Sequence, residues 1–246
     1  MKAIIKNIPN TITAGNLFCG CLAILSIAQG NLVSASWFVI TAAVLDFLDG
    51  FIARLLKVNS EIGKQLDSLA DIVTFGVVPG YTLYTLLTQT QFCENGTCWK
   101  ALVLPYYGFL ITIFSAVRLA KFNIDTRQTN SFIGVPTPAN ALMIASFSLT
   151  PITSFMYPVI HHYVFLAGVC LIMSYLLVAE IPLFALKFKS FGWKGNQPRF
   201  IFLLSSLLLL LMLGPSAAIF ILLLYVIMSL IFEKFNIYKK SQNTVL

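Results

Sequence analysis

The sequence predicts an all-α integral membrane protein with about eight transmembrane helices. Its residues are 58% hydrophobic and only 10% charged, which is typical of membrane proteins and leaves no room for a separate soluble domain. Apolar stretches of about 20 residues, the length that a helix needs to cross a bilayer, recur along the chain. The basic residues fall between these stretches in a pattern that predicts the topology.

Residues 1–10 are expected to form a short amphipathic segment at the membrane surface. The segment carries Lys2 and Lys6, which suit lipid headgroups, and it reaches Pro9 and Asn10 before any apolar core. A cleaved signal peptide would instead place an apolar run directly after the basic residues. The first transmembrane helix is therefore predicted to begin at about residue 11.

Hydropathy divides the rest of the chain into apolar stretches that match membrane spans. These stretches are residues 11–30, 33–56, 63–88, 101–121, 138–157, 163–186, 199–213 and 216–235. Only Gly214 and Pro215 separate the last two, which are either two spans or one interrupted segment. We expect one membrane domain, residues 1–246, with a six-helix core at 11–186 and two further spans at 199–235.

The basic residues test this arrangement. With eight spans, all of the 16 lysines and arginines except Lys100 fall on one side of the membrane. The positive-inside rule then predicts that both termini are cytoplasmic. The basic residues that give the chain its net charge of +7 then face anionic lipid headgroups. Nucleic acid is therefore not an expected partner.

Four acidic residues interrupt the apolar pattern in the second and third spans. Placing each carboxylate at the centre of a lipid-embedded helix would cost about 2.5 to 3.5 kcal/mol of free energy. Other groups must therefore compensate the charge of these residues. At about 100° per residue, Asp46 and Asp49 share one face of the second helix, while Asp67 and Asp71 share one face of the third. The two faces can meet across the short intervening turn.

Such a cluster predicts a site for divalent cations. Four carboxylates held close together repel one another unless cations lie between them, and a set of oxygen ligands without His or Cys suits Mg²⁺ or Mn²⁺ better than Zn²⁺. Asp46 lies eight residues before Arg54, or about 12 Å along a helix, which places the cluster near the predicted cytoplasmic face. The alternative is a charged helical hairpin at the membrane surface.

The same stretch resembles the signature of the CDP-alcohol phosphotransferases. From Asp46 to Asp71 it reads D-x2-D-G-x2-A-R-x8-G-x3-D-x3-D, with every fixed position filled. The resemblance implies an enzyme with two Mg²⁺ or Mn²⁺ ions held by Asp46, Asp49, Asp67 and Asp71, of which Asp71 is also the general base. It further implies a CDP-binding pocket formed by Asn16, Asp49, Gly50, Ala53, Arg54, Gly63 and Ser68.

Several of these residues also have purely structural readings. Asn16 belongs to a P-N-x-x-T-x-x-N segment like that which helps to close the nucleotide site in the family, or it caps the first helix. Gly50 and Ala53 either let a planar ring approach or allow tight helix packing. Arg54 either holds phosphate or anchors the helix at the membrane surface.

A second pair of segments points to the alcohol acceptor. Residues 118–123, R-L-A-K-F-N, and 132–139, F-I-G-V-P-T-P-A, resemble the corresponding regions of the phosphatidylserine synthases, one branch of the family. This resemblance implies transfer of a phosphatidyl group from CDP-diacylglycerol to L-serine, with release of CMP. Arg118, Lys121 and Asn123 are then the predicted contacts for the serine carboxylate or the lipid phosphate.

The sequence alone leaves alternative functions open. A sister enzyme would use glycerol 3-phosphate or inositol phosphate as the acceptor, and a non-catalytic membrane protein or cation transporter would use the carboxylates as an ion path. The resemblance also implies a homodimer, since family members often form one, and a location in the bacterial inner membrane. Between the third and fourth spans, Cys93 and Cys98 are close enough in the chain for a disulfide under oxidising conditions.

Overall fold

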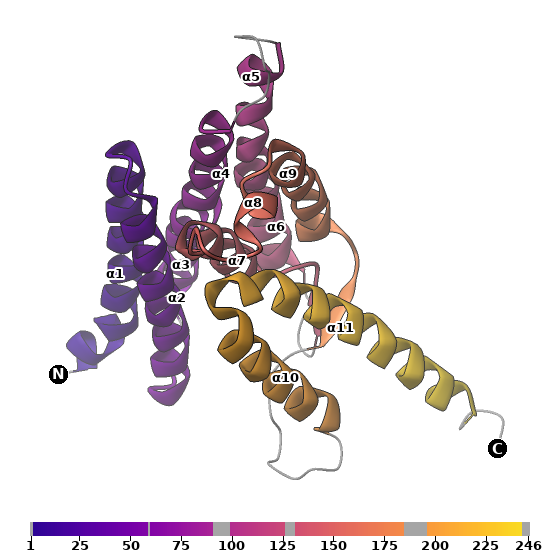
Figure 1. The fold of residues 1–246 in the computed structure, drawn as a ribbon. Helices are drawn as coiled ribbons and strands as arrows, with labels where there is room; N and C mark the ends of the chain where they lie inside the picture. The colour runs from indigo at the N-terminus through magenta and orange to yellow at the C-terminus, as the bar shows by residue number, and fades with distance from the viewer. Residues whose placement is uncertain (1, 59, 91–98, 126–130, 185–195, 243–246) are drawn as a thin grey trace.

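The protein is almost entirely helical (Figure 1). A computed structural model describes residues 2–58, 60–90, 99–125, 131–184 and 196–242. The predicted disulfide between Cys93 and Cys98 lies outside these residues. The first half contains α1 (Lys2–Ala28), α2 (Leu32–Leu55), α3 (Glu61–Ile72), a π-helix (Val73–Val77), α4 (Val78–Thr88), α5 (Trp99–Val103), a 3₁₀ turn (Leu104–Tyr107) and α6 (Gly108–Ile124).

The second half adds shorter helices and two strands. Its elements are β1 (Ser131–Ile133), α7 (Thr137–Leu149), α8 (Tyr157–Ile160), α9 (Tyr163–Val178), β2 (Pro182–Phe184), α10 (Gln197–Leu213), a 3₁₀ turn (Gly214–Ser216) and α11 (Ala217–Gln242). The strands pair antiparallel, with Phe132 opposite Leu183. The helical periodicity of the sequence did not predict this small sheet.

Four helical stretches of the described chain are long and apolar enough to cross a membrane, fewer than the eight spans predicted. They are Asn7–Ala28, Glu61–Thr88, Trp99–Ile124 and Gln197–Phe232, and α9 is a shorter apolar helix. Large apolar side chains are exposed on their outer faces, for example Leu204 and Leu211 on α10. Such faces suit contact with lipid chains.

Two predicted spans end earlier than expected. The helix predicted at 138–157 stops at Leu149, because Thr150 precedes Pro151 and has an extended backbone. The helix predicted at 163–186 stops at Val178, because the chain is extended at Ala179 and then enters β2. A hydropathy average cannot detect either break.

Near both termini, the structure defines the helix boundaries more closely than the sequence did. Helix α1 includes residues 2–10, with Pro9 inside the helix, and Figure 1 shows its first turns angled away from the remainder. The last two predicted spans are separate helices, since Gly214 adopts a positive φ of 57° that ends α10. Helices α10 and α11 run oblique to α1, α2, α4 and α6 in Figure 1.

The core has two layers of apolar side chains. One lies between α1, α2, the π-helix, α4 and α7 and includes Ala23, Ala35 and Phe75. The other joins α4, α6, α7 and α9 to the C-terminal helices through residues such as Ile144, Phe202 and Tyr225. The four acidic residues occupy one end of the first layer, where α1, α2 and α3 meet.

Candidate active site

Three of the four aspartates form one compact group. Asp46, Asp49 and Asp67 each offer a carboxylate oxygen, and these oxygens all lie within 4.8 Å of one another. Spacings of three residues on α2 and four on α3 place the side chains on facing sides of the two helices. The structure therefore brings together the faces that helical geometry predicts.

The fourth aspartate, Asp71, adjoins this group and is also buried. The Asp71 carboxyl group contacts that of Asp46 and accepts a hydrogen bond of 3.4 Å from Asn16 Nδ2. Asp71 is 8% exposed and Asn16 is fully buried. Because Asn16 lies in the middle of α1, the capping role considered for it is wrong.

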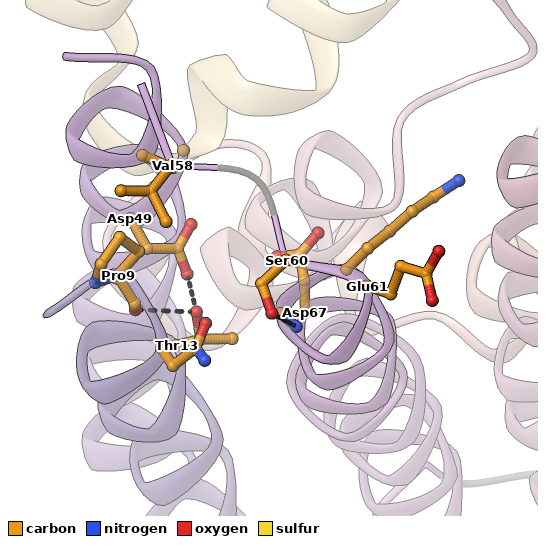
Figure 2. A pocket seen from close by; sticks show the side chains of 12 residues that line it. Pro9, Thr13, Asp49, Val58, Ser60, Glu61 and Asp67 are labelled. Atoms are coloured by element: carbon orange, nitrogen blue, oxygen red, sulfur yellow. Dashed lines mark hydrogen bonds between the residues drawn. The ribbon is translucent and has the colours of Figure 1, made fainter. Parts of the chain in front are cut away.

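Helix α1 contributes a second polar residue that the sequence analysis did not place in the site. Thr13 Oγ1 donates a hydrogen bond of 2.6 Å to Asp49 Oδ2 and also lies 3.0 Å from the Pro9 carbonyl oxygen (Figure 2). Thr13 is 3% exposed and Asp49 is 6% exposed. The signal in the sequence was the spacing of Thr13 and Asn16, which puts both on one helical face.

A cavity of about 480 Å³ opens beside the carboxylates. Residues of α1, the C-terminal end of α2 and the N-terminal part of α3 surround it, and Figure 2 shows the Asp49 and Asp67 side chains on opposite sides. Its lining consists of Pro9, Asn10, Thr13, Asp49, Gly50, Ala53, Val58, Ser60, Glu61, Gly63, Lys64 and Asp67. The combination of small, polar and acidic residues suits a polar ligand rather than an acyl chain.

Two small residues on the motif face shape this cavity. A Cβ atom added at Gly50 would have no atom within 4 Å, so tight helix packing does not explain this glycine. A Cβ atom at Gly63 would instead lie 2.8 Å from Asn10 Oδ1, which sits on the opposite wall. The missing side chain at Gly50 leaves open space, as expected where a ligand ring approaches.

Three of the predicted CDP-binding residues, Asn16, Arg54 and Ser68, lie outside this lining, and Asn16 is instead buried against Asp71. Arg54 is exposed, and its Nε donates a hydrogen bond of 2.9 Å to the Gly50 carbonyl oxygen. Ser68 Oγ donates to the Lys64 carbonyl oxygen and accepts a hydrogen bond of 2.8 Å from Asn123 Nδ2. In this structure neither the Arg54 nor the Ser68 side chain faces the cavity.

The predicted acceptor residues separate into one buried and two peripheral side chains. Arg118 is 7% exposed, interacts electrostatically with Asp71 and donates from Nη1 to Thr137 Oγ1 at 3.4 Å. Among the residues that the structure describes, none forms a hydrogen bond with its Nε. The guanidinium also lies 5.7 Å from the Phe122 ring centroid.

The other two acceptor candidates contact different surroundings. Lys121 is exposed and borders a small cavity of about 30 Å³ that Arg118 also lines. Asn123 links α6 to α3, because its carbonyl oxygen accepts a hydrogen bond of 3.0 Å from Lys64 Nζ. Only Arg118 therefore combines burial with proximity to the carboxylates.

The donor set fits a hard divalent cation. Every ligand atom in the group is a carboxylate oxygen, and the spacing of 4.8 Å or less allows several oxygens to contact one ion. Burial of Asp49 and Asp71 adds a second reason, because buried carboxylates need a compensating charge. Mg²⁺ and Mn²⁺ match these donors, although the residues do not distinguish the two ions.

Comparison with known proteins finds a matching family and named relatives. The model of the CDP-alcohol phosphatidyltransferase family matches residues 6–186. A relative named "CDP-diacylglycerol--serine O-phosphatidyltransferase" in Bacillus subtilis strain 168 is 38% identical over 180 residues, which cover 71% of this chain and 88% of that protein.

Other relatives match over shorter regions. A protein of the same name in Helicobacter pylori strain J99 is 39% identical over 138 residues, 55% of this chain and 54% of that protein. An archaetidylserine synthase of Methanothermobacter thermautotrophicus is 32% identical over 146 residues, 58% of each chain. In these two comparisons the match spans little more than half of the relative.

Proposed function

The chain belongs to the CDP-alcohol phosphatidyltransferase family, and we propose that it transfers the phosphatidyl group of CDP-diacylglycerol to L-serine. The products are phosphatidylserine and CMP. The single observation that carries this assignment is the group of Asp46, Asp49 and Asp67 oxygens within 4.8 Å of one another, beside a cavity wide enough for a nucleotide head. The names of the relatives support serine as the acceptor.

The carboxylates would hold the divalent cations, with Asp46, Asp49, Asp67 and Asp71 as the ligands. When bound, Mg²⁺ or Mn²⁺ neutralises charge on the diphosphate and on the departing CMP. Thr13 orients Asp49 through its 2.6 Å hydrogen bond, and this leaves the other Asp49 oxygen for the ion.

Asp71 is the general base for the serine hydroxyl. It takes the proton as the serine oxygen bonds to the phosphorus that carries the lipid, and the bond from phosphorus to CMP breaks. Asn16 Nδ2 donates a hydrogen bond to Asp71 Oδ1 and so helps to hold the carboxyl group in place. Burial of both residues excludes bulk water from the atom that receives the proton.

Most of the remaining predicted residues bind either the nucleotide or the alcohol acceptor. Gly50, Ala53 and Gly63 give the CDP moiety access to the cavity beside Asp49. Asn16 acts on the site through its hydrogen bond to Asp71. Arg54 and Ser68 reach CDP only if their side chains turn away from their present partners. Arg118 binds the serine carboxylate or lipid phosphate, with Lys121 and Asn123 at the edge of that site.

The proposal includes the membrane topology predicted from the sequence. Eight apolar segments cross or enter the bilayer, both termini are cytoplasmic, and residues 1–10 lie at the lipid surface of the bacterial inner membrane. Residues 11–186 are the catalytic core, and a homodimer is the expected assembly. Labelling of single cysteines placed at residues 57 and 100 from either side of intact vesicles tests the orientation, since the two positions should react from opposite sides.

The test of function measures CMP release from CDP-diacylglycerol by the purified protein. L-serine, glycerol 3-phosphate and inositol phosphate are supplied separately, each with Mg²⁺ or Mn²⁺ and with a chelator. Release that depends on both serine and the metal supports the proposal. Release with glycerol 3-phosphate alone identifies a sister enzyme, and no release with any acceptor supports an ion-transport or binding role.

A further inference from the structure

A set of three hydrogen bonds joins α6 to α3 at residues that flank Asp67 in the sequence. Asn123, in the last turn of α6, accepts a hydrogen bond of 3.0 Å from Lys64 Nζ through its carbonyl oxygen. Its side-chain Nδ2 donates a hydrogen bond of 2.8 Å to Ser68 Oγ. Ser68 Oγ in turn donates to the Lys64 carbonyl oxygen at 3.2 Å. One residue of α6 therefore contacts two residues that lie one turn apart on α3.

These contacts bear directly on the metal-binding group, because they fix the rotation of α3. Lys64, Asp67 and Ser68 fall within about 100° of one another around the helix. A side-chain oxygen about 5 Å from the helix axis moves by about 2 Å when the helix rotates by about 20°. Such a movement would separate the Asp67 oxygen from those of Asp46 and Asp49, which now lie within 4.8 Å of it.

The other neighbours of α3 leave this rotation less constrained. The helix continues into the π-helix Val73–Val77, whose wider turn interrupts the α-helical repeat, so packing of α4 does not by itself set the side-chain directions of α3. Helix α1 packs on α3, whereas Ile62 and Leu69 are 75% and 62% exposed. The hydrogen bonds from Asn123 hold α3 on the side that faces α6.

Helix α6 also carries the proposed acceptor-binding residue, Arg118. It lies five residues before Asn123, or about 7.5 Å along the helix axis. The Arg118 side chain is buried and bonds Thr137 on α7. A link between α6 and α3 therefore also sets the distance from the acceptor-binding residue to the metal-binding group.

We propose that Asn123 is a positioning residue for the metal-binding group: through its hydrogen bond to Ser68 it holds α3 in the rotation that brings Asp67 to Asp46 and Asp49. This inference rests on the proposed function for the cation that the carboxylates bind. The amide of Asn123 is already engaged by Ser68, so it does not serve as an acceptor contact. Loss of the amide weakens metal binding and leaves the affinity for serine unchanged.

Asn123→Ala tests this inference, because it removes the amide and keeps the carbonyl oxygen that Lys64 contacts. We expect the dissociation constant for Mn²⁺, measured without substrates by electron paramagnetic resonance of the free ion, to rise about tenfold. At saturating metal the KM for serine should change less than twofold. Gln65→Ala, which removes an exposed amide from the same helix α3, is the matched control and should bind Mn²⁺ as the wild type does.

Three results would overturn the inference. One is a wild-type dissociation constant for Mn²⁺ in Asn123→Ala. Another is a raised KM for serine with unchanged Mn²⁺ binding, which makes Asn123 an acceptor contact. The third is a lower melting temperature with unchanged Mn²⁺ binding, which assigns Asn123 to the stability of the fold alone.

A double-mutant cycle tests whether the effect passes through Ser68. Ser68→Ala should raise the Mn²⁺ dissociation constant as much as Asn123→Ala does, and the double variant should exceed either single variant by less than twofold. Ser68→Thr keeps the hydroxyl group and should cause a smaller rise than Ser68→Ala. Full multiplication of the two single effects, or an equal rise in both Ser68 variants, contradicts the mechanism.

The wild-type protein separates failure of this inference from failure of the proposed function. If it binds no Mn²⁺, both fail. If it binds Mn²⁺ and releases CMP with serine while Mn²⁺ binding is insensitive to Asn123, only the inference fails. If it releases CMP only with another acceptor, the serine assignment fails, and the rise in the Mn²⁺ dissociation constant still supports the inference because that measurement contains no acceptor.

Discussion

Thr13→Val isolates the hydrogen bond that links α1 to the metal-binding group. Valine has almost the same shape as threonine, so the helix and its packing are retained while the 2.6 Å bond to Asp49 Oδ2 is lost. Asp49 is 6% exposed, so water has little room to replace the hydroxyl. A hydrogen bond to a charged group contributes about 1.5 to 3 kcal/mol, which corresponds to a factor of about 10 to 100 in an equilibrium constant.

We therefore expect the Mg²⁺ or Mn²⁺ concentration for half-maximal CMP release to rise about 10- to 100-fold, the range typical for partners of metal-binding side chains. Saturating metal should restore most of kcat. Thr11→Val is the matched control, because Thr11 is exposed and its Oγ1 bonds the Asn7 carbonyl oxygen at 3.1 Å. Identical metal titrations for Thr13→Val and wild type would refute the idea that Asp49 is a ligand oriented by α1.

Three further predictions address the base, the cavity and the fold. Asp71→Asn should abolish CMP release without changing the elution of the detergent-solubilised protein; retained turnover would exclude Asp71 as the base. Gly50→Leu should fold normally, because Cβ meets no atom within 4 Å, but should raise the KM for CDP-diacylglycerol at least tenfold, and an unchanged KM would place CDP elsewhere. Gly108→Ala should destabilise the protein by about 1 to 3 kcal/mol, since its Cβ would lie 2.6 Å from the Gly80 carbonyl oxygen, and an unaltered melting temperature would contradict this packing.

Helical spacing predicted most of the carboxylate group. Residues three and four positions apart share a helical face, so Asp46 with Asp49, and Asp67 with Asp71, were expected to converge. The structure adds that the first three form the compact group, while Asp71 lies between Asp46 and Asn16. Spacing along each helix cannot assign these contacts, because they depend on the relative placement of α1, α2 and α3.

The sequence was less informative where elements are short or lie far apart in the chain. Hydropathy averaged along the chain predicted a helix at 138–157, whereas the helix in the structure ends at Leu149. Such averages also could not reveal that β1 pairs with β2. The acceptor candidates Arg118, Lys121 and Asn123 looked equivalent as neighbours in one motif. In the structure they lie at different positions around α6, and of the three only Arg118 is buried near Asp71.

By itself, the sequence determined the membrane class of this protein, its helical character and the residue types available for chemistry, because composition and spacing along a helix are local properties. Tertiary structure alone decided which side chains meet. Thr13 reaches Asp49 across 36 positions in the chain, and Asn123 reaches Ser68 across 55. Such contacts follow from how helices pack against one another, and the order of residues within any one helix does not specify that packing.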